Sequence, residues 1–162
     1  MPFASEVIRP FEAADAAGVL AFLDRLSVES RYRRFFGPPS TATLHAVASP
    51  DGIRHVALVA IDGRDVVGLA SFHVAADDPS HADASVVVAD DHQRHGLGTA
   101  LVFALGRLAR RQGVEHLTAT VLTDNLAVLT LLRKVAPSAG RIHDGITINV
   151  DIPLLPERTR AA

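Results

Sequence analysis

Residues 86–101, VVVADDHQRHGLGTAL, decide the fold expected for this chain. They begin as an apolar strand, pass through a turn that contains Gly96 and Gly98, and continue as an amphipathic helix. The first N–H groups of such a helix lack partners within it and lie at the positive end of its dipole. Glycines in the turn also allow a ligand to approach the backbone. The segment therefore predicts a site for an anion such as a phosphate or pyrophosphate.

This turn departs from two common phosphate-binding motifs and fits a third. A Walker loop ends in Gly-Lys-Ser/Thr, whereas Gly98 is followed by Thr-Ala. A dinucleotide-binding fingerprint needs a third glycine, at the position where this chain has Leu101. The pattern Q/R-x-x-G-x-G/A is matched by Gln93, Gly96 and Gly98.

The rest of the chain alternates between helical and strand patterns. Expected strands are 6–10, 54–61, 66–74, 82–88, 116–122 and a hairpin over 142–152; expected helices are 13–25, 28–36, 41–48, 98–112 and 125–135. Asp62-Gly63 and Asp144-Gly145 are predicted to form the hairpin turns, and Ser27 to cap the second helix. This order predicts an α/β fold, with one mixed sheet and helices on both faces.

Composition restricts the class of protein further. The 162 residues predict a single domain over 1–156, with a flexible tail at 157–162. A net charge of −2 argues against a polycationic nucleic-acid binder. There is no cysteine, so thiolate catalysis and thiolate metal sites are excluded. No signal peptide or membrane-spanning apolar run is evident, so a cytoplasmic protein without a membrane partner is expected.

The glycine-containing loop resembles the acetyl-CoA loop of the GNAT N-acetyltransferase superfamily, and the resemblance extends over most of the chain. A later segment fits the family pattern N-x-x-A-x-x-L-Y-x-K-x-G-F at Asn125, Ala127, Leu131 and Lys134. The resemblance implies the GNAT acyl-CoA N-acyltransferase fold, acetyl-CoA as co-substrate and transfer of an acetyl group to an amine. The cofactor contacts that it implies are Val86, Val87 and Val88 through the strand backbone, Gln93, Arg94, His95, Gly96, Leu97, Gly98 and Thr99 in the loop, and Asn125.

The later segment departs from the family at three positions. Leu132 stands where many members have Tyr, Ala136 replaces Gly and Pro137 replaces Phe. In the family that Tyr often protonates the departing thiolate, and the only tyrosine of this chain is Tyr32. A thiol of pKa ~8.5 needs an acid less than an alkoxide does, so transfer without the Tyr is chemically reasonable.

Residues 26–37, LSVESRYRRFFG, resemble a segment of bacterial Pat-type protein lysine acetyltransferases, in which the late Tyr is commonly replaced. The resemblance implies a protein lysine as acceptor, as on acyl-CoA synthetases. Lys134 is the only lysine here, so the acceptor is expected in another molecule. An amphipathic core helix is the alternative for this segment. A small amine as acceptor, a non-catalytic acyl-CoA-binding module, and a monomer or homodimer remain open.

Asp83 is the candidate catalytic base. The run ADASVVV at 82–88 resembles A-E-V-A-V-V-V of Pat-type enzymes, which places Asp83 at the position of their catalytic Glu, one methylene shorter. Apolar neighbours would raise its pKa toward a useful range. A solvent-facing carboxylate is the alternative, and His73 and His81 are competing bases.

Other polar residues near the loop carry weaker expectations. His92 and His95 have a ligand-like spacing, but no clustered carboxylate or cysteine completes a metal site, so no metal is expected. The pair Asp90-Asp91 is interpreted as a solvated turn.

Overall fold

The computed structural model describes residues 6–154. The strands are β1 (Val7–Pro10), β2 (His55–Asp62), β3 (Asp65–Val74), β4 (His81–Val88), β5 (His116–Leu122), β6 (Gly140–Asp144) and β7 (Thr147–Pro153). The α-helices are α1 (Ala16–Arg25), α2 (Val28–Phe35), α3 (Thr41–Val47), α4 (Leu97–Arg111) and α5 (Leu126–Val135), and the 3₁₀ helices are η1 (Ala13–Asp15) and η2 (Asp90–His92). The expected tail at 157–162 lies outside the described residues.

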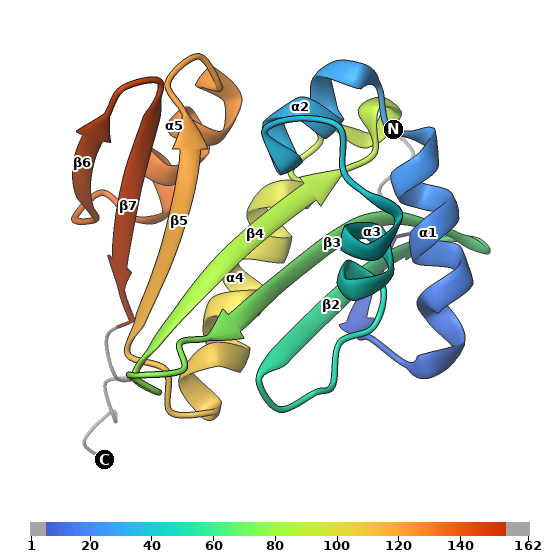
Figure 1. Ribbon diagram of the computed structural model, residues 1–162, viewed down its shortest axis with the longest axis horizontal. Coiled ribbons are helices and arrows are strands. Elements are labelled where there is room, and N and C mark those ends of the chain that lie inside the picture. Colours follow the sequence, from blue (N-terminus) through green and yellow to red (C-terminus); the bar gives the residue numbers. More distant parts are fainter. Residues whose placement is uncertain (1–5, 155–162) are drawn as a thin grey trace.

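The strands form one mixed sheet in the order β1-β2-β3-β4-β5-β7-β6. Neighbouring strands are antiparallel except β4 and β5, which are parallel and joined by the crossover through α4. In Figure 1 these two central strands start together and diverge toward their carboxyl ends. The predicted mixed α/β sheet is confirmed.

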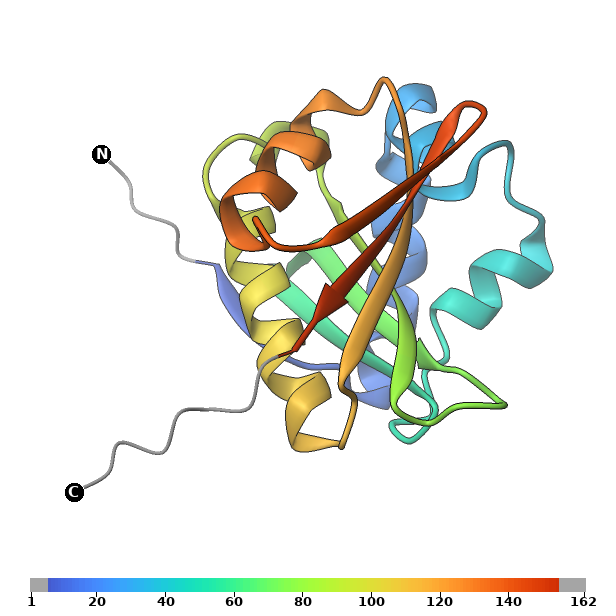
Figure 2. The same ribbon diagram turned by 90° about the vertical axis from the view of Figure 1, so that its left-hand side faces the viewer.

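Helices cover both faces of the sheet, as Figure 2 shows. On one face α4 buries Leu97, Leu101 and Leu105, at spacings of four residues, against apolar side chains of β2, β3 and β4. On the opposite face α1 buries Phe22 and Leu23 against the same three strands. α5 packs beside α4 and covers β5 and β7. None of the helices within residues 6–154 is long and apolar enough to span a membrane.

Side-chain caps explain where several helices begin. The Ser27 hydroxyl accepts a hydrogen bond from the N–H of Ser30 at the start of α2, as the sequence predicted. The segment at 13–25 is not one helix but η1 followed by α1, because the Asp15 carboxylate bonds Arg9 and the N–H of Glu12 at this point.

Both hairpin turns lie one residue later than predicted. Asp62 pairs with Asp65, so the first turn consists of Gly63 and Arg64 rather than Asp62-Gly63. A register shift in β2 just before this point explains the difference, since it sets which residues still pair. The second turn likewise begins at Gly145, because Asp144 pairs with Thr147.

Candidate functional site

The central feature is the cleft between β4 and β5. The two strands pair only over His81–Asp83 and His116–Thr118, at their amino ends. Beyond that point, within the described residues, β4 continues to pair with β3 and β5 with β7, but the two strands no longer pair with each other. The backbones of these two neighbouring strands therefore separate toward their carboxyl ends (Figure 1).

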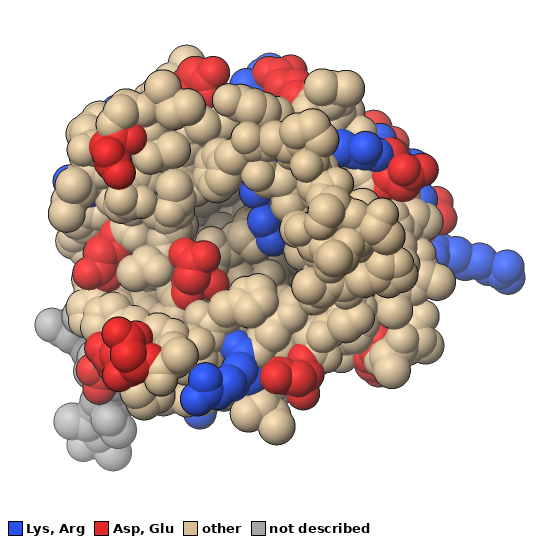
Figure 3. All heavy atoms as spheres, in the orientation of Figure 1, with Lys and Arg blue, Asp and Glu red and all other residues tan. Residues whose placement is uncertain are grey.

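The molecular surface is hollowed over this region, on the face that carries α2 and α3 (Figure 3). A groove there is lined by polar side chains of neighbouring strands: Asp83, Thr118, Thr120, Asn149 and Asp151. Basic atoms lie inside the hollow and acidic ones around it. Gly140, Arg141 and Ile142 of β6 also line it, so the groove combines polar, charged and apolar residues.

The loop at the open end of the cleft has the backbone geometry that the sequence predicted. Gly96 adopts φ +85° as the N-cap of α4, a left-handed conformation that favours glycine. A Cβ at Gly96 would meet nothing within 4 Å, so the space beside it is open. Gly98 has a different role: a Cβ there would lie 3.4 Å from Leu131, so it allows α4 and α5 to pack closely.

The predicted loop residues differ in what they present to solvent. Gln93, Arg94 and His95 are exposed, and Arg94 also adopts a positive φ of 64°. The side chain of Leu97 is buried in the α4 core, so only its backbone can meet a ligand. Thr99 is half-buried in the first turn of α4. An exposed run of backbone at the N-terminus of a fifteen-residue helix is suited to an anion.

The predicted contacts outside the loop would also act through backbone atoms. Val87 buries its side chain toward α1, whereas those of Val86 and Val88 pack toward α4. Asn125 is buried and caps α5, its side-chain oxygen accepting a hydrogen bond from the N–H of Val128 at 3.3 Å. The side-chain oxygen of Asn125 therefore already has a hydrogen-bond partner within the protein.

Asp83 lies at the closed end of the cleft, on the last β4 residue that pairs with β5. Its carboxylate accepts a hydrogen bond from the Thr118 hydroxyl at 3.4 Å. Desolvation by the walls of the hollow raises its pKa, although Thr118, His73 and Arg34 each favour the charged form. A carboxylate that is open to solvent yet has a raised pKa is suited to proton transfer.

Asp83 belongs to a row of polar residues that crosses the sheet. In register, His55 pairs with His73, His73 with Asp83, Asp83 with Thr118, and Thr118 with Asp151. Residues opposite each other on neighbouring strands point to the same face, so these side chains share the face of the hollow. His73, a competing base from the sequence, is thus directly beside Asp83.

His55 and His73 form a stacked pair with ring centroids 3.9 Å apart. Burial, and then the charge of His73, lower the pKa of His55 to about 4. Burial also lowers the pKa of His73, although Asp83 opposes the shift. Both rings are therefore neutral at neutral pH. The Nε2 atom of His55 is buried without a hydrogen-bond partner among the described residues.

The sequence did not identify His55 or Arg34 as part of the site. Arg34 reaches this cluster from α2. Burial lowers the pKa of Arg34, and the charge of Asp83 opposes that shift. The guanidinium lies 4.7 Å from the centre of the Phe35 ring. The register of the β2–β3 hairpin could have placed His55 opposite His73, but no local pattern indicates the contact with α2.

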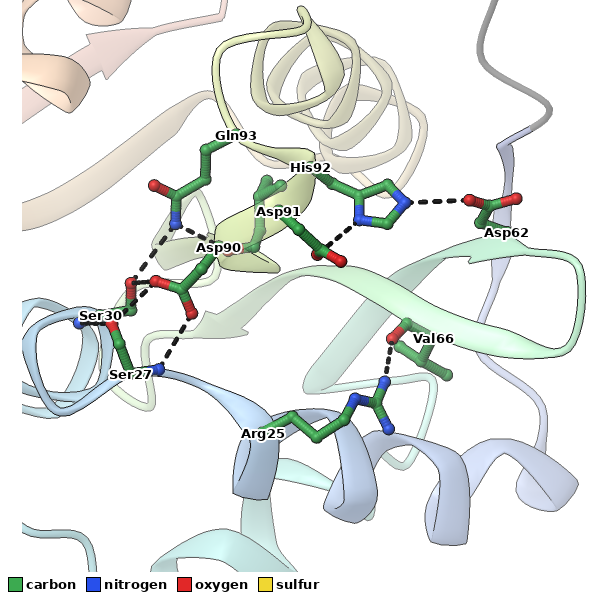
Figure 4. Close-up of polar contacts among 10 residues, drawn as sticks. Arg25, Ser27, Ser30, Asp62, Val66, Asp90, Asp91, His92 and Gln93 are labelled. Atoms are coloured by element: carbon green, nitrogen blue, oxygen red, sulfur yellow. Dashed lines mark hydrogen bonds and ion pairs between the residues drawn. The ribbon is translucent and has the colours of Figure 1, made fainter. Parts of the chain in front are cut away.

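Asp90 and Asp91 are solvent-exposed, as expected, but Asp90 also makes contacts that the sequence did not indicate. Its carboxylate accepts hydrogen bonds from the N–H and hydroxyl of Ser27 and from the hydroxyl of Ser30 (Figure 4). The side-chain amide of Gln93 donates to the Val88 carbonyl at 3.0 Å and to the Ser30 hydroxyl at 3.4 Å. These contacts join the loop to the first turn of α2, which is some sixty residues away in the sequence.

His92 attaches the same loop to the β2–β3 hairpin. One ring nitrogen lies 2.9 Å from a carboxylate oxygen of Asp62 and the other 2.8 Å from one of Asp91 (Figure 4). The hydrogen bonds to Asp62 and Asp91 raise the pKa of His92. His92 therefore forms ion-pair contacts beside the loop, with Asp62 and Asp91.

His81, the other competing base, lies at the start of β4. Its ring contacts Asp78 at 2.7 Å and stacks on His116 with the planes 4° apart and the centroids 4.5 Å apart. His116 in turn contacts Asp151 at 2.9 Å. The side chains of His81, His116 and Asp151 are close enough to be considered as metal ligands. However, the two imidazole rings are stacked in parallel, so the lone pairs of their nitrogens lie in parallel planes and do not point at one ion.

The position of the missing Tyr is closed to solvent. Leu132 is buried in the core formed by α5, β5 and β7. It therefore supports packing and has no access to the cleft. Tyr32 lies on α2, with 45% of its surface exposed.

Comparison with known proteins identifies the family. The acetyltransferase (GNAT) family matches residues 20–136, more than half of the chain. The acetyltransferase Pat of Mycolicibacterium smegmatis is 30% identical over 151 residues, which are 90% of this chain and 45% of that protein. Acetyltransferase PA5475 of Pseudomonas aeruginosa is 30% identical over 132 residues, 77% of this chain and 70% of that protein. This chain thus spans less than half the length of the mycobacterial relative.

Solved structures share the fold. The GNAT domain of PAT from S. lividans superposes with a TM-score of 0.81 at 23% identity, covering 91% of this chain and 89% of that one. The protein yncA of Salmonella typhimurium, solved with its cofactor acetyl-CoA, superposes with a TM-score of 0.71 at 20% identity, covering 98% and 99%. The diverging strands, the glycine-capped loop and these matches lead to one conclusion: the chain belongs to the acetyltransferase (GNAT) family and is related to its Pat-type members.

Proposed function

We propose that the chain transfers the acetyl group of acetyl-CoA to an amine, with a lysine side chain of another protein as the acceptor. The observation that carries the proposal is that β4 separates from β5 beyond Asp83 and then leads into the loop at residues 93–99, which precedes α4. Asp83 and Val88 are separated by about 16 Å of extended strand. A cofactor held at the loop by its diphosphate could therefore extend along β4 toward Asp83.

The loop residues fit the cofactor. The space beside Gly96 is open, and Arg94 and His95 are exposed next to the positive end of the α4 dipole. Thr99 would offer a hydroxyl, while Leu97 would offer its N–H. Bound acetyl-CoA supplies an activated acetyl group, whose C–S bond is replaced by a C–N bond to the acceptor. Backbone N–H groups of β4 just beyond Asp83, where β5 no longer pairs with the strand, are the proposed donors to the acyl oxygen.

Asp83 is the proposed base. An amine must lose a proton before it attacks, and a lysine has an ordinary pKa of ~10.4. Asp83 would take that proton directly or through a water, and its raised pKa improves the match. The neutral imidazole of His73 beside it is available to accept the proton in turn. The thiolate of coenzyme A would leave without help from position 132, which is buried.

The surface of α2 supports a protein lysine over a small amine. The groove that contains Asp83 also contains Asp151 and Arg141, so its charge by itself favours neither acceptor. α2, formed by the Pat-like segment, exposes Val28 and Tyr32, with Phe36 after them at the same four-residue spacing. An apolar stripe on a helix beside a polar groove is suited to a macromolecular partner. The relation to the Pat-type acetyltransferases points in the same direction.

Isothermal titration and a coenzyme A release assay test the proposal together. Acetyl-CoA should bind, and release should require an acceptor protein such as an acyl-CoA synthetase, with an acetylated lysine found by mass spectrometry. If turnover occurs only with small amines, the acceptor is a small molecule and the proposal of a protein lysine is wrong. Tight binding of acetyl-CoA without turnover on proteins or on small amines would instead support a non-catalytic acyl-CoA-binding module. Leu132 and the short side chain of Asp83 favour that alternative.

A further inference from the structure

We infer that Asp90 is a positioning residue that fixes the acceptor-side helix α2 to the cofactor loop, so that cofactor binding sets the acceptor wall of the cleft. The inference rests on the proposed function and extends it, because it concerns how the two binding regions are coupled. It starts from the hydrogen bonds drawn in Figure 4.

One carboxylate receives three donors from α2 and its cap. Oδ2 of Asp90 accepts the N–H of Ser27 at 2.9 Å, and Oδ1 accepts the hydroxyls of Ser27 at 2.8 Å and Ser30 at 2.7 Å. The Ser27 hydroxyl itself caps α2 by accepting the N–H of Ser30 at 3.1 Å. Burial alone would raise the pKa of Asp90, but the hydrogen bonds from Ser27 and Ser30 outweigh it and lower the pKa. Asp90 is thus an ionised acceptor at a helix N-terminus, where a negative charge is favourable.

Gln93 extends the connection to β4. Its amide contacts both the Ser30 hydroxyl and the carbonyl of Val88, the last residue of β4. Asp90 is the first residue of η2 and Gln93 directly follows it, and the chain then continues into Gly96 and α4. The loop proposed to bind the diphosphate and the helix proposed to face the acceptor therefore share one hydrogen-bond network.

Apolar packing holds α2 only weakly, which gives this network its importance. Ser30 is the one fully buried residue of α2, and Phe35, which is partly buried, is its one hydrophobic residue packed against the core under α1; Val28 and Tyr32 are exposed. α1, by contrast, buries Val19, Phe22 and Leu23. The placement of α2 therefore depends on polar contacts, and a change at Asp90 should move α2 while leaving the backbone donors of residues 96–99 in place.

The test compares Asp90→Ala with Asp91→Ala, a carboxylate of the same loop that contacts the His92 ring instead of α2. In Asp90→Ala we expect the acceptor KM to rise about tenfold while the Kd of acetyl-CoA changes less than threefold. Asp90→Asn, which keeps an acceptor oxygen for the serine hydroxyls, should restore part of the effect. Asp91→Ala should leave both constants near the wild type. An equal loss of cofactor and acceptor binding in Asp90→Ala would make the residue merely structural and overturn the inference.

Hydrogen exchange supplies a readout that does not depend on turnover. In the wild type, acetyl-CoA should protect amides of both residues 93–100 and α2; in Asp90→Ala the protection should be confined to 93–100. Equal protection of α2 in both proteins would overturn the inference alone. A wild type that fails to bind acetyl-CoA would overturn the proposed function and the inference with it.

Ser30→Ala keeps the test decisive if Asp90→Ala does not fold. It removes one of the three donors, so a smaller rise in acceptor KM is expected. In the double variant Asp90→Ala/Ser30→Ala the two effects should be less than additive, because both changes break the same contact. Strict additivity would contradict the network.

Discussion

The proposed cofactor end and the proposed acceptor end of the cleft are built from different parts of the chain. The cofactor end is one continuous segment, in which a strand, a glycine with φ +85° and a helix follow each other between Val86 and Thr99. The acceptor end is a row of side chains from β2, β3, β4, β5 and β7, with Arg34 added from α2. The first depends on backbone geometry, whereas the second depends on register and helix placement. Substitutions should therefore affect the two ends separately.

The largest effect is expected from Asp83→Asn. If Asp83 is the base, turnover should fall by ~10²–10⁴-fold while the Kd of acetyl-CoA stays near the wild-type value. Steady-state rates combined with titration calorimetry measure both quantities. Asp151→Asn, another carboxylate of the groove, is the matched control and should retain most of the turnover. A parallel loss of cofactor binding in Asp83→Asn would assign Asp83 a structural role.

His55 predicts how stability depends on pH. Its folded pKa is about 4, below the ordinary 6.5, so the unfolded chain binds more protons between these values and stability falls as the pH is lowered from about 6.5 to about 4. The loss from this residue is on the order of 3 kcal/mol at most. In His55→Gln, chemical denaturation at several pH values should give a shallower decline across that window. The exposed His143→Gln is the control, and an unchanged slope in His55→Gln would contradict the assignment.

Gly96→Ala tests the cofactor end. A non-glycine residue in the left-handed region costs roughly 1–2 kcal/mol, and relief of that strain would displace the loop. We expect acetyl-CoA to bind about tenfold more weakly, measured by calorimetry. Gly113→Ala is closely matched, because Gly113 also has φ +85° with no atom near a Cβ, but it follows the other end of α4. It should lower the unfolding temperature similarly and leave cofactor affinity intact, and equal affinities in both variants would exclude the loop geometry as the cause.

Thr118→Val should give the smallest effect. The Thr118 hydroxyl lowers the pKa of Asp83 through a 3.4 Å hydrogen bond, so its removal should raise that pKa further. The limb of the rate profile that reports the base should then move to higher pH by a few tenths of a unit, with turnover at pH 8 within about threefold of the wild type. Thr120→Val serves for comparison, since the Thr120 hydroxyl bonds Asn149 instead. A profile that does not move would mean that Asp83 is not the titrating base.

The sequence by itself determined the features that depend on neighbours in the chain. Apolar periodicity located the α4 core face through Leu97, Leu101 and Leu105, and the spacing of Gln93, Gly96 and Gly98 located the loop before it. Ser27 was recognised as a cap because capping involves residues three positions apart. These signals are local, and together with the resemblance over the loop they were sufficient for the fold and family.

Only the tertiary structure decided the acceptor side. The sequence did not indicate the contacts of Asp90, because its partners, Ser27 and Ser30, are about sixty residues away in the sequence. The row that places His55 and His73 beside Asp83 exists because the register of three strands aligns them. Strand register and helix docking follow from the packing of the whole core, and the neighbouring sequence does not show which distant residue a polar side chain will contact. For this reason the glycine-containing turn ahead of α4 could be predicted from the sequence, whereas the surroundings of the proposed base could not.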